Sequence, residues 1–262
     1  MTDFFSIISG SSGNCTYISD GKTKLLIDCG LSGKRLCEAL AAMHIPVSDI
    51  DAVLVTHEHS DHTKGLGVIA RKYKIPVYAT NGTHRNMSVG EIDFSQRYAV
   101  TPFSDFFINS IGVRPFAIPH DAAEPVGYSF YIDNKKYSIA TDMGFLSDDI
   151  KKQLLGSHSI ILESNHDVEM LKLGPYPYPL KRRILSDIGH LSNEVAAQTA
   201  VELAKNGTKH IMLGHLSKEN NRPEIAMLES FNALTNSGAN VGEDVTLTVA
   251  DRYKITSFGG IL

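Results

Sequence analysis

Short runs of apolar and β-branched residues recur along the whole chain and predict many short strands. Most are four to seven residues long and are bounded by Gly, Pro, Asn or Asp. The run AVLVT at 52–56 is continuously apolar, which is typical of a strand buried on both faces. Asp133 and Asn134, between two runs, predict a hairpin turn. The predicted strands lie at 4–8, 16–18, 24–27, 52–56, 76–79, 113–118, 127–132, 136–140, 159–162, 209–213 and 245–249.

Apolar residues at helical spacing predict helices between these strands. Leu36, Leu40 and Met43 mark the first helix, and further helices are expected at about 63–73 and 148–155. Another begins at Ser192 or Asn193 and runs to about position 205. The last helix begins at Pro223 and has four apolar residues on one face: Ile225, Leu228, Phe231 and Leu234.

The order of the elements favours an α/β fold of one domain covering residues 1–262. Strands dominate the first part, helices and strands alternate towards the end, and no Gly/Pro/Ser-rich linker divides the chain. The segment 174–179, rich in proline, is expected to be a loop. Two sheets covered by helices are the layered arrangement that fits this order best.

The composition limits the kind of protein this is. With 262 residues, 42% of them hydrophobic, the chain can bury a sizeable core. A net charge of −4 argues against a uniformly basic nucleic-acid coat, but a local basic groove remains compatible with it. The three cysteines form no CxxC motif, so we expect reduced thiols and no disulfide-linked partner. No apolar stretch approaches the roughly 20 residues that span a bilayer, and we expect a cytoplasmic protein without a membrane partner.

Three imidazoles and one carboxylate follow the apolar run at 52–56. They belong to the sequence His57-Glu58-His59-Ser60-Asp61-His62. Side chains 57 and 59 project to one side of an extended chain, and 61 and 62 lie one turn further on. Imidazole nitrogens suit zinc, iron or manganese, and a carboxylate widens that choice. Isolated surface histidines do not explain so dense a group, so the sequence predicts a metal site.

Further metal-binding groups stand in matching positions. His120, Asp142 and His215 each lie just past the end of a predicted buried strand, and such strand ends converge on one cleft. Asp142 is expected to bridge two divalent ions, because its two oxygens can be shared between ions about 3.5–4 Å apart. We expect one ion to be held by His57, His59 and His120. We expect the other ion to be held by Asp61, His62 and His215.

The tetrapeptide GHLS occurs twice, so His190 competes with His215 for the ligand role. His215 ends a predicted strand and is preferred as the ligand. His190 precedes the helix that begins at Ser192 or Asn193, where it is either suited to holding an anion or an ordinary surface residue. The remaining histidines at 44, 84, 158 and 210 are given no role.

These residues resemble the metallo-β-lactamase superfamily over essentially the whole chain. HEHSDH at 57–62 is followed by His120, Asp142 and His215 in that superfamily's order. The resemblance implies an αββα four-layer sandwich, two mixed β-sheets flanked by helices. It also implies that Asp28, in LLIDCG, orients a ligating histidine from behind. Relatives such as RNase J carry a β-CASP insertion, for which this chain has no room.

More narrowly, the sequence is similar to the YycJ/WalJ group. The similarity rests on SGSSGNCTYI at 9–18, LESNHDVEML at 162–171, GPYPYPLKRRILSDIGHLSNE at 174–194 and LGHLSKENNRP at 213–223. It implies a cytoplasmic exonuclease of the 5′-to-3′ type that acts on DNA, with links to DNA repair or cell-wall signalling.

The nuclease interpretation assigns further roles. A hydroxide held between the ions would attack phosphorus, with Asp61 as ligand and orienting group. His166 is the first candidate for protonating the leaving group and His190 the second. A basic trio could follow the phosphates, with Tyr176 and Tyr178 stacking on bases. The tentative substrate-binding residues are Ser11, Ser12, Asn14, Asn165, Lys181, Arg182, Arg183 and Ser192.

Two other functions remain open at this stage. A hydrolase of a small ester, thioester, lactone or cyclic phosphodiester would use the same ligands, because metals do not encode the substrate. A regulatory protein with structural metals is disfavoured, since structural zinc sites are usually closed by four protein ligands. The sequence does not choose among zinc, manganese and iron, nor does it set the oligomeric state.

Overall fold

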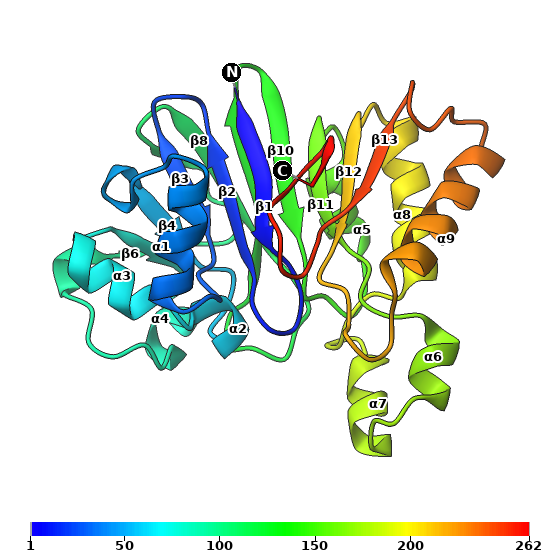
Figure 1. Cartoon of the computed structure of the whole chain (residues 1–262), viewed down its shortest axis with the longest axis horizontal. Coiled ribbons are helices and arrows are strands. Elements are labelled where there is room, and N and C mark those ends of the chain that lie inside the picture. The colour runs from blue at the N-terminus through cyan, green and yellow to red at the C-terminus, as the bar shows by residue number, and fades with distance from the viewer. Residues whose placement is uncertain (1, 262) are drawn as a thin grey trace.

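Two β-sheets face each other in the centre of the molecule, and helices cover their outer faces (Figure 1). The structure is a computed structural model and describes residues 2–261. The four-layer αββα sandwich expected from the sequence is therefore confirmed. Within the described residues no helix is long and apolar enough to cross a membrane.

The first sheet has eight strands, and its second half is parallel. In spatial order the strands are β15 (Gly260–Ile261), β14 (Thr256–Ser257), β1 (Asp3–Ile8), β2 (Cys15–Ser19), β3 (Lys24–Ile27), β4 (Ala52–Leu54), β5 (Val77–Ala79) and β6 (Arg97–Ala99). The helices that follow its strands are α1 (Gly33–Ala42), α2 (Ser60–Thr63), α3 (Leu66–Tyr73) and α4 (Asn81–Asn86). Short 3₁₀ turns occur at Val47–Asp49 and Phe94–Gln96.

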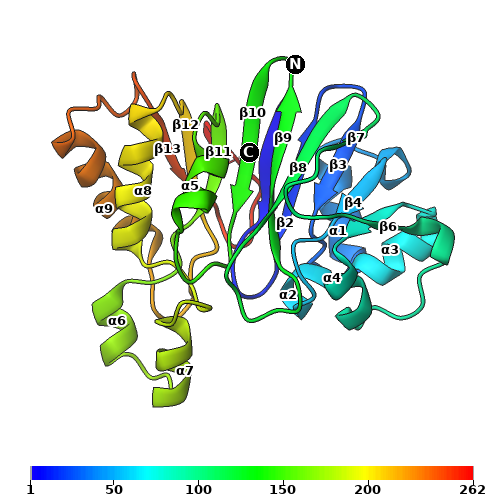
Figure 2. The ribbon, with the colours of Figure 1, turned by 180° about the vertical axis from the view of Figure 1, so that it is seen from behind.

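The second sheet has seven strands, and those from β10 to β13 run parallel. In spatial order they are β13 (Thr246–Val249), β12 (His210–Gly214), β11 (Ser159–Glu163), β10 (Lys135–Ala140), β9 (Val126–Ile132), β8 (Ile111–Ala117) and β7 (Phe106–Ile108). Helices α5 (Asp148–Leu154), α8 (Asn193–Lys205) and α9 (Pro223–Asn236) cover its outer face (Figure 2). Helices α6 (Val168–Leu173) and α7 (Tyr178–Ile184) project beyond one end of the sandwich.

The space between the sheets is filled by large apolar side chains. Phe4 and Leu25 of the first sheet meet Tyr128 and Phe130 of the second in one buried cluster. A separate apolar cluster lies under the helices on each outer face. The run at 52–56 is completely buried, as its uninterrupted apolar sequence predicts. This double-sided burial anchors the strand whose end carries the HEHSDH motif.

Several local predictions are confirmed by the backbone. Asp133 and Asn134 have φ angles of 49° and 59°, as the tight turn between β9 and β10 requires. The hydroxyl of Ser192 accepts from Val195 N and caps α8.

Three local predictions are confirmed only in part. The helix expected at about 63–73 is α3, which begins at Leu66, and the separate short helix α2 precedes it; the chain turns between them near Gly65, where a Cβ atom would lie 2.2 Å from Leu31 O. The loop expected at 174–179 turns into α7, because Pro179 fits the first turn of a helix. Helix α9 buries Ala226 and Ser230 together with Leu234, since small side chains let it approach α8 and β13. Leu228 of the predicted apolar face is exposed.

Candidate metal centre

The carboxyl ends of parallel strands from both sheets meet at one end of the sandwich. The residue after β10 is Thr141, and Asp142 follows it; Glu163 is the last residue of β11, and His215 follows β12. The HEHSDH motif enters from the first sheet, past the end of β4. Asp142 and His215 adopt left-handed backbone conformations, with φ of 59° and 55°. These turns let side chains leave buried strands and face one volume.

The first group of candidate ligands is His57, His59 and His120. One nitrogen from each ring lies within 4.8 Å of the others. His57 Nε2 is 3.0 Å from His59 Nδ1, and both rings pack edge-on to His120. His120 donates from Nδ1 to Gly189 O, which leaves Nε2 facing the group. Three converging imidazole nitrogens are a typical ligand set for a divalent transition metal.

The second group is Asp61, His62 and His215, whose ligand atoms also lie within 4.8 Å of one another. Asp142 stands between the two groups. Its Oδ2 is 3.4 Å from His62 Nε2, and its Oδ1 is 3.9 Å from His120 Nε2. The structure thus brings together all seven candidate ligands named from the sequence, and Asp142 lies between the two groups.

Buried carboxylates hold two of the histidines from behind. Asp28 Oδ2 accepts from His62 Nδ1 at 2.8 Å, while its Oδ1 accepts from Thr56 N. The arrangement matches the orienting role that the family resemblance implies for Asp28. Asp28 thereby fixes the ring of His62 so that Nε2 faces Asp61 and Asp142.

Glu163 performs the same task for His215, and sequence reasoning missed it. Its side chain is fully buried, and Oε1 accepts from both His215 Nδ1 (2.9 Å) and His190 Nδ1 (2.8 Å). Its Oε2 accepts from the backbone N–H groups of Met143 and Leu191. The signal was present in the sequence, because an acid ends the apolar run SIILE just as Asp142 follows its own strand.

The electrostatics follow from this arrangement. Burial opposes protonation of His62, but the carboxylates of Asp28 and Asp142 outweigh it and raise its pKa to about 9. Burial and the neighbouring imidazoles lower the pKa of His57 well below its ordinary value. Burial would raise the pKa of Asp61, but His215 and His62 hold it well below the usual range. Within residues 2–261, Asp142 Oδ2 and His215 Nε2 are buried without a hydrogen-bond partner.

This donor set fits divalent metal ions. Buried polar atoms without partners are costly in a folded protein, and a cation satisfies both an orphaned carboxylate oxygen and an orphaned imidazole nitrogen. Nitrogen and oxygen donors without thiolates are compatible with zinc, manganese or iron.

Three of the residues predicted to contact substrate are buried and contact neighbouring groups of the chain. Asn165 is buried and donates from Nδ2 to His215 O, and Ser192 caps α8. Asn14 is buried too, with Nδ2 3.0 Å from His62 Nε2 and Oδ1 accepting from Gly10 N. These side chains hold the loops of the centre in place. Ser11 and Ser12 are exposed at the tip of the β1–β2 loop.

His166 and His190, the two candidates for the leaving group, differ in access. His166 is 1% exposed, belongs to none of the candidate ligand groups, and burial lowers its pKa to about 4. A buried group is poorly placed to protonate a substrate, and this favours His190 over His166 for the leaving group. The side chain of His190 is 17% exposed, and its ring lies beside those of His120 and His215.

The predicted basic trio, Lys181, Arg182 and Arg183, lies on α7, and two of its members bond to other groups of the protein. Lys181 donates to Lys172 O, and Arg183 pairs with Asp121, the neighbour of His120. Arg182 is exposed. Arg183 therefore connects α7 to the rim of the metal centre, while Arg182 is the member of the trio left for a ligand.

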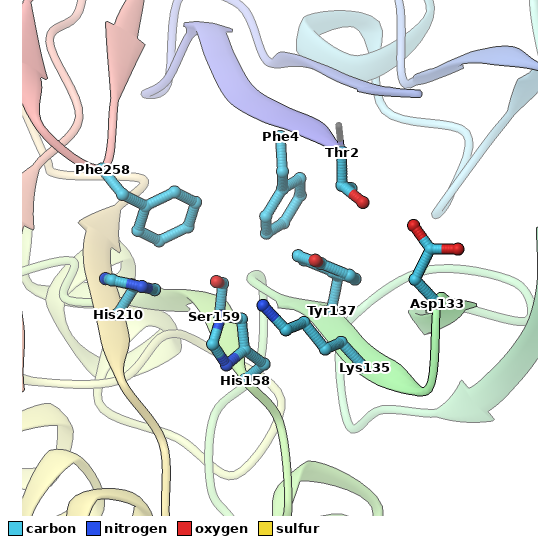
Figure 3. Close-up of a pocket in the computed structure, with 9 residues that line it drawn as sticks. All are labelled: Thr2, Phe4, Asp133, Lys135, Tyr137, His158, Ser159, His210 and Phe258. Carbon is cyan, nitrogen blue, oxygen red and sulfur yellow. The ribbon is translucent and has the colours of Figure 1, made fainter. Parts of the chain in front are cut away.

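A cavity of about 440 Å³ lies at the other end of the sandwich (Figure 3). It is lined by Lys135, Ser159 and His210, the first residues of β10, β11 and β12, whereas the metal centre lies past the last residues of these strands. His158 also lines it, with its ring 5.2 Å from that of His210. His158 and His210 therefore lie at the opposite ends of these strands from the metal centre.

Comparison with known proteins agrees with this geometry. The sequence profile of the metallo-β-lactamase superfamily matches residues 8–215. The chain belongs to the metallo-β-lactamase superfamily. The expected resemblance is confirmed, and so is the expectation of a hydrolase of this superfamily.

Within the superfamily the chain is similar to two curated proteins over most of its length. It is 44% identical to exodeoxyribonuclease YycJ of Bacillus anthracis over 91% of this chain and 92% of that protein. It is 43% identical to exodeoxyribonuclease WalJ of Streptococcus pneumoniae over 91% and 90% of the two chains. The metallo-β-lactamase fold protein YhfI from Bacillus subtilis superposes with a TM-score of 0.70 at 15% identity, covering 98% and 100% of the chains. That last likeness concerns the fold alone.

Proposed function

We propose that this metallo-β-lactamase superfamily member is a two-metal phosphodiesterase that acts on DNA as an exonuclease of the 5′-to-3′ type. The observation that carries the proposal is the pair of adjacent ligand groups, with an Asp142 oxygen 3.9 Å from His120 Nε2 of the first and another 3.4 Å from His62 Nε2 of the second. The names of the relatives that are 43–44% identical support DNA as the substrate. Cytoplasmic location and a part in DNA repair belong to the same proposal.

Seven side chains would hold the ions: His57, His59 and His120 for one, Asp61, His62 and His215 for the other, with Asp142 between them. When bound, two divalent ions supply Lewis-acid stabilisation of a phosphoryl group and a water with a lowered pKa. Glu163 and Asp28 are positioning residues, because each fixes the tautomer of a histidine in which Nε2 faces the centre.

Asp61 and His190 are the groups that would handle protons. Asp61 is held as a carboxylate by the neighbouring His62 and His215, so it can orient a nucleophilic water by accepting its hydrogen bond. His190 donates Nδ1–H to Glu163, and this leaves Nε2 at the partly exposed rim as the atom that can hand a proton to a leaving oxygen. Arg182 and the tip of the β1–β2 loop, with Ser11 and Ser12, are exposed and are the remaining candidates for contact with substrate.

The test is turnover by purified protein loaded in turn with zinc, manganese or iron. Substrates are DNA strands labelled at either end, RNA, and small esters. We expect release of nucleotides from the 5′ end of DNA, and Asp142→Ala should abolish it. Asp149→Ala, which removes an exposed acid of α5, is the matched control. Cleavage of esters without cleavage of DNA would replace the proposal by the small-molecule hydrolase, and activity that survives Asp142→Ala would refute the assigned centre.

A further inference from the structure

A groove of about 600 Å³ lies at the β6 edge of the first sheet. It is formed by α4, the segment that follows it, and β6. Figure 1 shows α4 at the same end of the sandwich as α2, which carries Asp61 and His62. β6, which lines the groove, is the edge strand of this sheet and is separated from β4 by β5.

The chemistry of the groove is basic, aromatic and free of acids. Arg85 and Arg97 line it, and none of the described residues that line it carries a carboxylate. Within residues 2–261 the guanidinium group of Arg97 forms one hydrogen bond, from Nε to Ile92 O. Neither Arg85 nor Arg97 forms an ion pair with another described residue. Phe94 lines the groove with 88% of its surface exposed, the highest value among the large hydrophobic residues whose side chains the structure describes. A positively charged groove with an exposed aromatic ring suits a single nucleic-acid strand, with phosphates on the arginines and a base on the ring.

The groove is built into the fold and does not depend on a substrate to form. Arg71 donates to Val89 O and Glu91 O and thereby fixes the rim. His84 donates from Nε2 to Tyr98 O, which ties α4 to β6. A preformed site loses less conformational entropy when a ligand binds.

Hydrogen bonds connect α4, which lines the groove, with the HEHSDH motif of the metal centre. The first turn of α4 donates from Gly82 N to Glu124 Oε2, and Ala123 N donates to Glu58 Oε1 within the HEHSDH motif. The segment that contains these two residues begins at the candidate ligand His120. Neighbouring strands lie about 4.8 Å apart, so β6 is about 10 Å from β4.

We propose that this groove, defined by Arg85, Phe94 and Arg97, holds the single strand of a DNA substrate whose end lies at the metal centre. The proposal rests on the nuclease function proposed above and adds the path of the substrate. It predicts that the groove matters more for long strands than for short ones, because a dinucleotide at the metals does not reach Phe94.

Two variants test the groove: Phe94→Ala and the double variant Arg85→Gln/Arg97→Gln. The control is Lys22→Ala/Lys205→Ala, which removes the same charge at the opposite end of the sandwich. Thermal unfolding identifies any variant that fails to fold. The first readout is the ratio of kcat/KM for a strand of about 12 nucleotides to that for a dinucleotide. We expect Phe94→Ala to lower this ratio by about 5- to 100-fold, the range for loss of one stacked base, and the control to leave it unchanged.

The second readout is binding of a fluorescent single strand by fluorescence anisotropy at several salt concentrations. Each phosphate contact contributes about 0.7 to the slope of log affinity against log salt, so the double arginine variant should reduce its magnitude by about 1.4. If the wild-type protein digests DNA and the folded variants keep both the ratio and the slope, the proposed strand-binding role of the groove is refuted. The nuclease proposal then remains intact. A wild-type protein without nuclease activity refutes the nuclease proposal, and failure to bind a single strand at low salt then refutes the groove independently.

Discussion

Replacement of Glu163 by glutamine should weaken metal binding through His215. The carboxylate accepts hydrogen bonds from four N–H groups: His215, His190, Met143 and Leu191. Glutamine keeps one oxygen and places an NH₂ group against two of these donors. The new donor must face either the two backbone N–H groups or the two imidazoles.

The magnitude follows from these contacts. Two hydrogen bonds to a buried charged group become donor–donor contacts, and each such bond contributes about 1.5–3 kcal/mol, so the variant should lose about 3–6 kcal/mol of its free energy of unfolding. If the imidazoles face the NH₂ group, His215 adopts the other tautomer and carries its proton on the nitrogen that faces the centre. Loss of such an orienting partner typically costs about 10- to 100-fold in metal affinity.

The assay separates these two effects. Urea unfolding measures stability, and competition with a chromophoric chelator measures metal affinity under conditions where the variant is folded. Glu124→Gln is the matched control, because Glu124 Oε2 accepts from the backbone of Gly82 and contacts no histidine. A folded Glu163→Gln protein that binds metal as tightly as the wild type would refute the orienting role. Lower stability with unchanged affinity would leave Glu163 a purely structural residue.

Three further predictions follow from the site and its surroundings. His190→Gln should lower kcat on DNA by about 100-fold or more. The effect should be smaller on phosphodiesters that have a p-nitrophenyl leaving group, and an equal loss on both substrates would contradict the general-acid role. Burial lowers the pKa of His166 to about 4, so as the pH falls this histidine is protonated in the unfolded chain before it is protonated in the folded protein. The free energy of unfolding of the wild type should therefore fall by up to about 3 kcal/mol as pH drops from about 6.5 to 4. His166→Leu should remove this part of the pH dependence in urea titrations, and an unchanged pH profile would refute it. Gly30→Ala should abolish folding or metal binding, since its Cβ would lie 1.7 Å from Asp61 O, whereas Gly259→Ala, with nothing closer than 3.8 Å, should be tolerated.

The amino-acid sequence determined the order of strands and helices and the first set of ligands. The run at 52–56 is apolar on both faces, which requires a buried strand whatever its partners are. Ligands close together in sequence, such as His57 and His59, are brought together by local geometry alone. For the distant residues His120, Asp142 and His215, strand ends gave the right expectation, because parallel strands of a sheet present their carboxyl ends at one edge.

The tertiary structure alone decided which polar side chains serve the centre and which face solvent. Glu163 and His166 are three residues apart, yet their side chains differ in what they contact. The carboxylate of Glu163 accepts hydrogen bonds from two imidazoles, whereas the buried ring of His166 has no hydrogen-bond partner within the described chain. Helix α9 likewise buries Ala226 instead of Leu228, because the approach of α8 favours the smaller side chain. Periodicity in a sequence describes one element at a time, whereas burial and hydrogen bonding depend on what the neighbouring elements place opposite each residue.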